Sequence, residues 1–230
     1  MFNLLSWNIQ QGGGSRVHSI IKYILAKKPQ LMVLNEFKNN ANGTIIRTKL
    51  LQYGYLHQVV SNATSDLNSV LIASKLPGNS FLFSKNELQF PQSMLKLSLE
   101  VFDVYGVYFP HKKKHNCFQV LLDDLQKTDR PAIITGDYNS GKNFIDQKGD
   151  SFWYENYFFK LEELNYVDAF RLIHGDKKEY SWFSHQGNGY RYDHMYISNA
   201  LQTLVKDCFY DQKAREDKLS DHAPMFLVLS

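Results

Sequence analysis

The segment "PAIITGDYN", residues 131–139, joins a short apolar run to a carboxylate and an amide. Residues 131–135 are typical of a buried strand, because the run is short, contains β-branched side chains and opens on a proline. Asp137 and Asn139 follow where such a strand ends, although charged and amide side chains are uncommon in a hydrophobic core. A single Asp or Asn in this place is most often a turn residue that caps its own backbone.

Other apolar strands of the chain meet polar residues in the same way. The places are "LLSWN" with Asn8, "LMVLNE" with Glu36, "PAIITGDYN" with Asp137 and Asn139, "YRYDHMYIS" with Asp193, and "LSDHAPM" with Asp221 and His222. Five places that all carry carboxylate, amide or imidazole groups are harder to explain as turns. Loops on a rigid sheet are where catalytic residues concentrate, so we expect these side chains to meet at one site.

Strands outnumber helices in the pattern of the chain. Apolar residues at helical spacing predict helices near 17–25, 43–53, 117–125 and 157–165. The expected strands are 2–6, 31–35, 69–74, 94–102, 103–109, 131–135, 180–184, 190–198, 204–210 and 225–230. With no repeat and no linker-like stretch, about ten strands and three or four helices indicate a single domain over 1–230. So many strands imply two packed sheets with helices on their outer faces.

The composition fits a protein with a substantial core. The 230 residues are 43% hydrophobic and 14% aromatic, and the net charge of +3 permits an anionic substrate without requiring one. Cys117 and Cys208 lie in apolar stretches outside any metal-binding spacing, so we expect buried free thiols in a reduced compartment. The opening "MFNLLSWNIQ" has neither a secretory signal nor a membrane span. We therefore expect a soluble, cytoplasmic protein without membrane contact.

Four of the side chains expected to converge are carboxylates: Glu36, Asp137, Asp193 and Asp221. Two carboxylates about 4 Å apart repel by roughly 4 kcal/mol at an effective dielectric of ~20, so the cluster needs a counter-charge. Oxygen ligands with few histidines select Mg²⁺, Ca²⁺ or Mn²⁺. Mg²⁺ is the usual partner of a phosphate substrate, and the natural reaction is metal-assisted phosphoester hydrolysis.

The polar motifs together resemble a known family. "LSWNIQ", "LNEF", "VYFPH", "TGDYNSG", "GYRYDHMYIS" and "LSDHAPM" occur in the order and spacing of the endonuclease/exonuclease/phosphatase superfamily, whose fold is DNase I-like. The likeness runs from about residue 4 to 229. It implies an α+β fold, a four-layer αββα sandwich of two mainly antiparallel sheets flanked by helices.

The chain is most similar to the exonuclease III and abasic-site endonuclease branch. "YFP" at 108–110, "VDAFRLIHGDKKEYSWFS" and Gly189-x-Arg191-x-Asp193 carry this likeness. Many phosphatase and sphingomyelinase members have a histidine where Tyr108 stands. Gln10 stands where the family often has an acidic or amide residue, and we leave it out of the expected metal site because Gln is a poor metal ligand.

The resemblance implies a role for each polar residue. His222, paired with Asp193, stabilises the phosphorus centre or assists proton transfer. Asp137 orients or deprotonates the attacking water and Asn139 holds a phosphate oxygen, while Asn8 either donates to the phosphate or tethers the carboxylates. The remaining assignments are Tyr108 as a hydrogen-bond donor to the phosphate, Glu36 as metal ligand and Asp221 as a second or supporting ligand. By strand alternation we expect His194 to point away from Asp193 and Asp221 to turn toward Glu36.

Residues flanking these motifs are candidates for substrate contact: Arg191, Trp182, His111 and Lys112. The last two belong to "HKKKH" at 111–115, a charge run that is either a solvated face or a contact to a nucleic-acid backbone. Trp182 resembles a residue that lines a sugar pocket, although an aromatic residue in a strand is more often part of a core.

The function that the sequence favours is a monomeric, Mg²⁺-dependent nuclease acting on DNA, with Mn²⁺ as a substitute ion. A phosphatase or phosphodiesterase for a small or lipid phosphate is one alternative, against which Tyr108 argues. An inactive nucleic-acid-binding member of the fold is the other, against which the nearly complete polar set argues.

Overall fold

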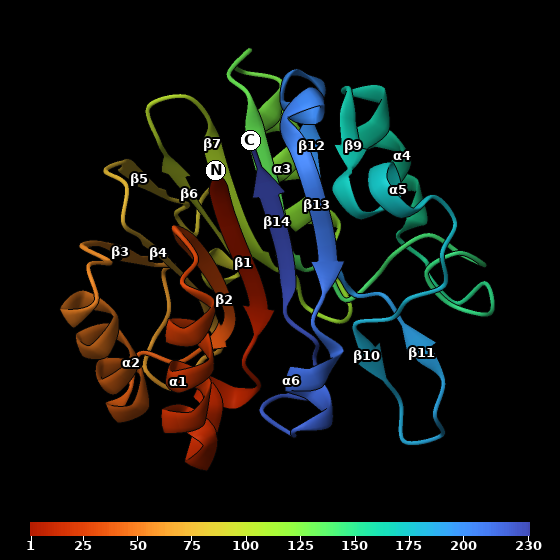
Figure 1. The fold of residues 1–230 in the computed structure, drawn as a ribbon. Coiled ribbons are helices and arrows are strands. Elements are labelled where there is room, and N and C mark those ends of the chain that lie inside the picture. Colours follow the sequence, from red (N-terminus) through yellow and green to blue (C-terminus); the bar gives the residue numbers. More distant parts are fainter.

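Two six-stranded sheets pack face to face at the centre of the molecule (Figure 1). The computed structural model describes residues 1–230. Sheet A contains, in spatial order, β13 (Val205–Tyr210), β14 (Met225–Leu229), β1 (Phe2–Asn8), β2 (Leu31–Phe37), β4 (Ser69–Ser74) and β3 (His57–Val60). Sheet B contains β5 (Asn79–Leu82), β6 (Met94–Ser98), β7 (Asp103–Tyr108), β8 (Ala132–Asp137), β12 (Asp193–Ser198) and β9 (Tyr166–Asp168). A separate two-stranded sheet joins β10 (Trp182–Phe183) to β11 (Gly189–Tyr190).

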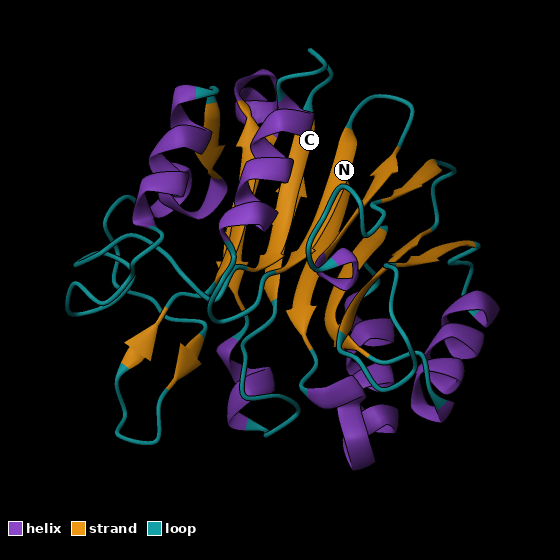
Figure 2. Ribbon diagram, turned by 180° about the vertical axis from the view of Figure 1, so that it is seen from behind, coloured by secondary structure: helices purple, strands orange, loops and turns teal.

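Helices lie outside the two sheets (Figure 2). The α-helices are α1 (Val17–Lys27), α2 (Ala41–Gln52), α3 (His115–Leu125), α4 (Glu155–Glu163), α5 (Ala169–His174) and α6 (Gln212–Glu216). Three short 3₁₀ segments, η1 (Gln11–Arg16), η2 (Pro91–Ser93) and η3 (Asn199–Leu204), complete the structure.

Three apolar clusters hold these layers together. One lies between the sheets and includes Val33 and Ile133, which come from facing strands. A second packs α3 and α4 on the outer face of sheet B, and the third packs α1 and α2 on the outer face of sheet A. The layers are therefore helix, sheet, sheet and helix, which confirms the predicted αββα sandwich.

Each sheet contains one parallel strand pair near its middle, and all other neighbours are antiparallel. In sheet A, β1 runs parallel to β2 after the chain crosses through α1, and in sheet B, β7 runs parallel to β8 after α3. Parallel partners end at the same edge of a sheet. This places the ends of four strands, with Asn8, Glu36, Tyr108 and Asp137, at one edge of the sandwich.

The observed elements differ from the predicted ones mainly in short segments. The structure has fourteen strands and six α-helices, more than predicted, because β3, β5, β9, α5 and α6 are too brief to leave a periodic pattern. The expected strand 190–198 is broken, since residues 191 and 192 lie between β11 and β12. The expected helix 43–53 begins earlier, at Ala41, because the Asn40 side chain caps it by accepting a hydrogen bond from the Gly43 amide.

Two further expectations concern the cysteines and the membrane. Cys117 and Cys208 are both buried and form no disulfide, as predicted. No helix of the structure combines the length and the apolar character that crossing a bilayer requires.

Candidate active site

The edge of sheet B where β7 and β8 end carries a row of polar side chains. Strand register pairs Asp137 with Tyr108 on one side and with Asp193 on the other. Residues in register on neighbouring strands present their side chains on the same face. The structure therefore brings these three predicted site residues together.

His222 reaches this row from the segment that precedes β14. Its Nδ1 lies 2.7 Å from Asp193 Oδ2, and its Nε2 lies 4.0 Å from Asp137 Oδ2. Burial opposes a charged imidazole, but the charge of Asp193, its hydrogen bond and the charge of Asp137 outweigh burial and raise the pKa of His222 to about 10. The expected His222–Asp193 pair is thus present, and it carries a proton at neutral pH.

Two main-chain contacts hold His222 in this position. The indole nitrogen of Trp7 donates to the His222 carbonyl oxygen at 2.9 Å. The His222 amide donates to Ser220 Oγ at 3.2 Å, and the same hydroxyl donates to the Asn8 carbonyl oxygen at 2.7 Å. The imidazole is therefore anchored to β1 as well as to Asp193.

Asn8 ties two carboxylates from different sheets. Its Nδ2 donates to Glu36 Oε1 and to Asp137 Oδ2, each at 3.0 Å, and its Oδ1 accepts from the Gln10 amide. These contacts use the polar atoms of the Asn8 side chain. Of its two predicted roles, the structure therefore shows the one in which Asn8 links the two carboxylates. Burial and the nearby Asp193 raise the pKa of Asp137, although His222 acts in the opposite direction.

Glu36 projects into the site from a bulge in β2. The register with β4 shifts between Asn35 and Phe37, and Glu36 has a φ of +54°, in the left-handed region that a glutamate rarely adopts. Its Oε2 accepts from the Gln11 amide at 2.8 Å and from Asn68 Nδ2 at 3.0 Å. Strained backbone of this kind concentrates at functional sites, where it aims a side chain that regular geometry would direct elsewhere.

The donor atoms at this edge fit a hard divalent cation. Asp137, Asp193 and His222 each offer an atom within 4.8 Å of the others. His222 is a poor ligand in this arrangement, because a protonated imidazole has no lone pair to give. Asp193 Oδ1 is buried without a hydrogen-bond partner, and Glu36 accepts hydrogen bonds only from neutral groups. Carboxylate oxygen atoms with free lone pairs are what Mg²⁺ and Mn²⁺ bind in proteins.

The Asp221 carboxylate contacts Trp182. Its Oδ2 accepts a hydrogen bond from Trp182 Nε1 at 3.1 Å, and neither Asp221 nor Glu36 belongs to the cluster around His222. The expectation that Asp221 turns toward Glu36 rested on strand alternation, but Asp221 lies in a bend before β14, where alternation does not apply. The same contact places Trp182 beside the site.

Arg191 is a buried structural cation, which corrects its predicted contact with substrate. It is 1% exposed, and its guanidinium binds Asp146 at 2.7 Å and Asp168 at 2.5 Å. Arg191 precedes β12, so the alternation that begins at Asp193 does not extend to it. Burial would raise the pKa of Asp168, but the charge of Arg191 outweighs burial and holds it well below the usual range.

His194 is structural, as predicted. Its ring is fully buried, and Nε2 lies 2.8 Å from the Ser140 carbonyl oxygen.

Asn139 follows Asp137 in a tight turn with a φ of +49°. Its Nδ2 donates to the Phe109 carbonyl oxygen at 3.0 Å and to Asp137 Oδ2 at 3.3 Å. Its amide hydrogens are therefore directed to groups within the protein, one of them Asp137, and not to the phosphate oxygen that we expected.

The basic run at 111–115 divides into exposed and buried parts. Lys114 is fully buried, and its Nζ donates to the carbonyl oxygens of Tyr138 at 2.8 Å and Asn139 at 2.7 Å. Burial lowers the pKa of Lys114 to about 7, against the opposing charge of Asp137. His111 and Lys112 remain exposed and are available to a ligand.

Two hollows open on either side of His111. One, of about 260 Å³, is lined mainly by aromatic side chains together with Lys112 and Asn139, and Trp153 forms part of its wall. The other, of about 430 Å³, reaches Tyr108 and Asn68. Burial and then the charges of Glu36 and Asp137 raise the pKa of Tyr108, so its phenol keeps the proton that it would donate.

Several residues of the site were not predicted. Asn68 contacts Glu36 and lies 3.4 Å from the Tyr108 hydroxyl, and Asn35 Nδ2 donates across the sheets to the Val107 carbonyl oxygen at 2.7 Å. Both asparagines flank apolar strands, which is the signal that identified the other site residues. Lys114 had no such signal, because lysines in a charge run are usually solvated.

Comparisons with known proteins identify the family and the fold. A family model described as the endonuclease/exonuclease/phosphatase family matches residues 5–222. Two exodeoxyribonucleases of Streptococcus pneumoniae strains are each 31% identical over 126 residues, a match that covers 47% of this chain and 44% of each relative. The chain thus matches less than half the length of these curated relatives.

Solved structures share the fold over the whole chain. A 3′ phosphatase from Neisseria bound to a product DNA hairpin has a TM-score of 0.85 at 22% identity, with 100% of both chains covered. An AP endonuclease from Archaeoglobus fulgidus has a TM-score of 0.84 at 24% identity, again with 100% of both chains covered. With its polar edge, its two mixed sheets and a family model that spans nearly all of its length, the chain belongs to the endonuclease/exonuclease/phosphatase family.

Proposed function

We propose that this chain is a divalent-metal-dependent nuclease that hydrolyses DNA phosphodiester bonds, with Mg²⁺ as its ion and Mn²⁺ as a substitute. The observation that carries the proposal is the buried His222–Asp193 pair, whose free Nε2 lies 4.0 Å from Asp137. All these groups come from one chain, so the monomer is the proposed active form.

Asp137 is the group that would take a proton from the attacking water. Its raised pKa makes it a stronger base than an ordinary carboxylate, and Asn8 and Asn139 fix its orientation. Because Asn8 holds Glu36 to the same carboxylate, water and ion would be placed by one hydrogen-bonded unit.

The divalent ion is proposed to bind on the side of the site that carries the carboxylate oxygen atoms. Glu36 would hold the ion, with Asp137 beside it and Asp221 in a supporting place. A bound divalent ion polarises a phosphate oxygen and offsets the negative charge that develops there.

His222 would stabilise the same charge from the other side. It is protonated and fixed by Asp193, so its Nε2–H is a preorganised donor for a phosphate oxygen. The Tyr108 hydroxyl, at the end of β7, is a second donor for the substrate, and it is neutral. His111, Lys112 and Trp182 are exposed or half-exposed around the site and would contact the nucleic acid.

DNA is the proposed substrate because of the relatives. The curated relatives are described as exodeoxyribonucleases, and the solved neighbours as a 3′ phosphatase bound to a DNA hairpin and an AP endonuclease. The exposed basic residues and the aromatic hollow beside Asn139 suit phosphates and unstacked bases, respectively.

A substrate panel tests the proposal. The purified chain is incubated with Mg²⁺, Mn²⁺ or EDTA and with abasic duplex, blunt duplex, single-stranded DNA, RNA, a 3′-phosphorylated primer and a small phosphodiester. We expect metal-dependent DNA cleavage that His222→Ala and Asp137→Asn abolish. His185→Ala and Asp129→Asn, which change exposed residues of the same types, serve as controls.

The outcomes separate the alternatives. Cleavage of only the small diester removes the nuclease assignment, and release of only 3′-phosphate makes the chain a phosphatase. Binding of DNA without turnover of any substrate identifies an inactive member of the fold.

A further inference from the structure

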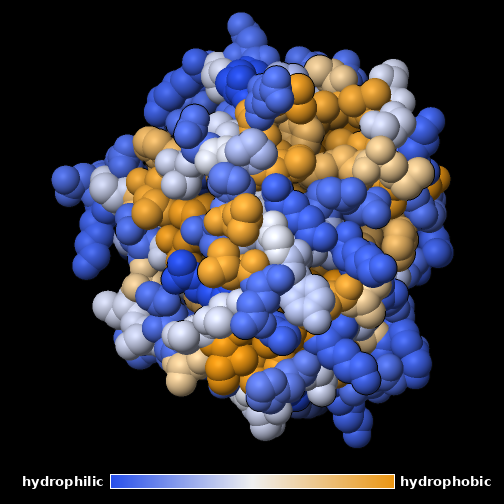
Figure 3. All heavy atoms as spheres, turned by 60° about the vertical axis from the view of Figure 1, so that its left-hand side comes forward, coloured by the Kyte–Doolittle hydropathy of each residue, from blue (hydrophilic) through white to orange (hydrophobic).

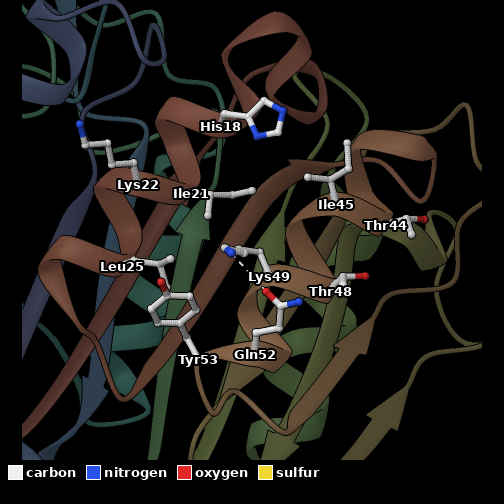
Figure 4. Close-up of a pocket in the computed structure, with 10 residues that line it drawn as sticks. All are labelled: His18, Ile21, Lys22, Leu25, Thr44, Ile45, Thr48, Lys49, Gln52 and Tyr53. Carbon is white, nitrogen blue, oxygen red and sulfur yellow. Dashed lines mark hydrogen bonds between the residues drawn. The ribbon is translucent and has the colours of Figure 1, made fainter.

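Helices α1 and α2 leave an open groove between them on the outer side of sheet A. It encloses about 620 Å³ and has an apolar bed formed by Ile21, Leu25, Ile45 and Tyr53 (Figure 4). In the view of Figure 4, His18 and Ile45 lie toward one end, and Leu25 and Tyr53 toward the other. None of these residues belongs to the proposed nuclease site, so the groove is a separate feature.

The rim of the groove is basic. His18, Lys22 and Lys49 line it, and no acidic residue does. Lys22 forms no ion pair, and Lys49 Nζ donates only to the neutral Gln52 side chain at 3.2 Å. The positive charge at this rim is therefore not neutralised by the protein itself.

This charge imbalance extends over the whole N-terminal part of the chain. Glu36, which is engaged in the nuclease site, is the only acidic residue among positions 1–65. The lysines and arginines in the same stretch are Arg16, Lys22, Lys27, Lys28, Lys38, Arg47 and Lys49. Of these, Lys27 pairs with Asp211. Charge complementarity therefore favours an anionic ligand for this face.

Helix α2 carries two large apolar side chains on its outer side in addition to those on its inner side. Ile46 and Leu50 are buried against the sheet, whereas Ile45 and Leu51 are 38% and 52% exposed. A second hollow of about 350 Å³, reached by Leu51, lies along the same helix. Figure 3 turns this side of the molecule forward and shows apolar patches bordered by hydrophilic side chains. Apolar surface with a polar rim is typical of a protein-binding site.

One edge of the groove offers hydrogen-bonding groups at regular intervals. Thr44, Thr48 and Gln52 lie four residues apart along α2, which corresponds to roughly 6 Å at each step. Two residues of an extended chain cover about the same distance. A peptide lying along α2 would therefore meet a polar side chain at every second residue and turn alternate side chains onto the apolar bed.

We infer that the α1–α2 groove is a docking site for a short, extended, acidic segment of another protein, in which apolar residues alternate with Asp or Glu. The apolar side chains enter the bed, and the carboxylates meet the basic rim. From His18 to Leu25 the groove is about 10 Å long, so three or four extended residues fill it. The docking site does not depend on the proposed nuclease activity.

A peptide array tests this inference on the intact chain. It contains hexapeptides in which Asp or Glu alternates with Ile, Leu, Val, Phe, Tyr or Trp. One matched array replaces the acids by Lys, and another replaces the apolar residues by Ser. Members that bind are remeasured in solution by fluorescence polarisation at low and high salt. We expect binding only to the acidic–apolar array, and weaker binding at high salt because the rim is exposed.

Variants locate the binding. Lys49→Glu and Ile45→Glu should each weaken the binding at least tenfold, whereas Lys206→Glu, at an exposed position of β13, should leave it unchanged. DNA cleavage should be the same in Lys49→Glu as in the unmodified chain, which separates docking from catalysis. The inference is overturned if no array member binds above its matched controls, or if Lys49→Glu binds as well as the unmodified chain. It is also overturned if single-stranded DNA or vesicles of anionic lipid displace the peptide from the groove more strongly than free acidic peptide does.

Discussion

The ammonium group of Lys114 donates a hydrogen bond of 2.7 Å to the main-chain carbonyl oxygen of Asn139. A buried lysine thereby fixes the turn that follows Asp137, although it touches no expected substrate position. We expect Lys114→Met to lower kcat by roughly ten- to a hundredfold with little change in KM, because displacement of Asp137 disturbs the reacting geometry rather than binding.

Steady-state kinetics on a DNA substrate measure this effect, with Lys113→Met as the matched control on the exposed part of the same loop. An equal loss in both variants would mean that only the charge of the loop matters. An unchanged kcat in Lys114→Met would show that the turn holds its shape without the lysine.

The pair formed by His222 and Asp193 gives a second prediction. Asp193→Asn removes the charge that keeps His222 protonated, so the pKa of His222 should fall from about 10 toward its ordinary value of 6.5. We expect kcat to drop by roughly 10²- to 10⁴-fold at neutral pH. Titration of the imidazole by NMR, next to Asp150→Asn as an exposed control, distinguishes a lost charge from a lost fold. A pKa that stays near its original value in the variant would contradict the assigned partner.

Stability should depend on pH through His222. The folded chain keeps the imidazole proton up to about pH 10, whereas the unfolded chain releases it near pH 6.5. The stabilisation from the pair is therefore complete below the lower value and is lost as pH rises through the higher one.

Urea unfolding with EDTA present measures this contribution in the chain and in His222→Asn. The difference in unfolding free energy between them should shrink steadily from about pH 6 to pH 10. A constant difference over this range is incompatible with a protonated His222 in the folded state.

Glu36 and Asp221 should differ in their importance for the ion. Glu36→Gln keeps the shape of the side chain and loses its charge, so Mg²⁺ affinity should fall at least about tenfold. Asp221→Asn should have a smaller effect, because Asp221 lies outside the buried cluster and already binds Trp182. Calorimetric titration with Mg²⁺ compares the two, and a larger loss in Asp221→Asn would reverse the assignment.

The sequence predicted those site residues that interrupt strong patterns. Asp137 and Asp193 stand at the ends of long apolar strands, where a carboxylate is conspicuous, and the fold then places them in register. Both sheets were predictable for the same reason, since β2, β8 and β14 have continuous apolar runs. The edge strands β3 and β5 are only four residues long and are half-buried or exposed, so the sequence shows no hydrophobic pattern that predicts them.

The wrong predictions arose because local sequence patterns do not show which side chains outside the strands and helices are buried. Arg191 was expected to contact the substrate because it flanks a site motif, yet it lies in an irregular segment just before β12 and is buried. Lys114 was grouped with its exposed neighbours, because nothing in "HKKKH" shows which lysine points inward. Packing against residues distant in the sequence decides the orientation of Lys114, and the neighbouring sequence does not show it.

All three tryptophans of the chain lie around the same catalytic edge. Trp7 donates to the carbonyl oxygen of His222, Trp182 donates to Asp221, and Trp153 lines the hollow beside Asn139. The protein's indole fluorescence therefore originates entirely in the surroundings of the site. Binding of an ion or of a nucleotide at the proposed site should therefore change this emission, and single Trp→Phe replacements would report which wall of the site responds.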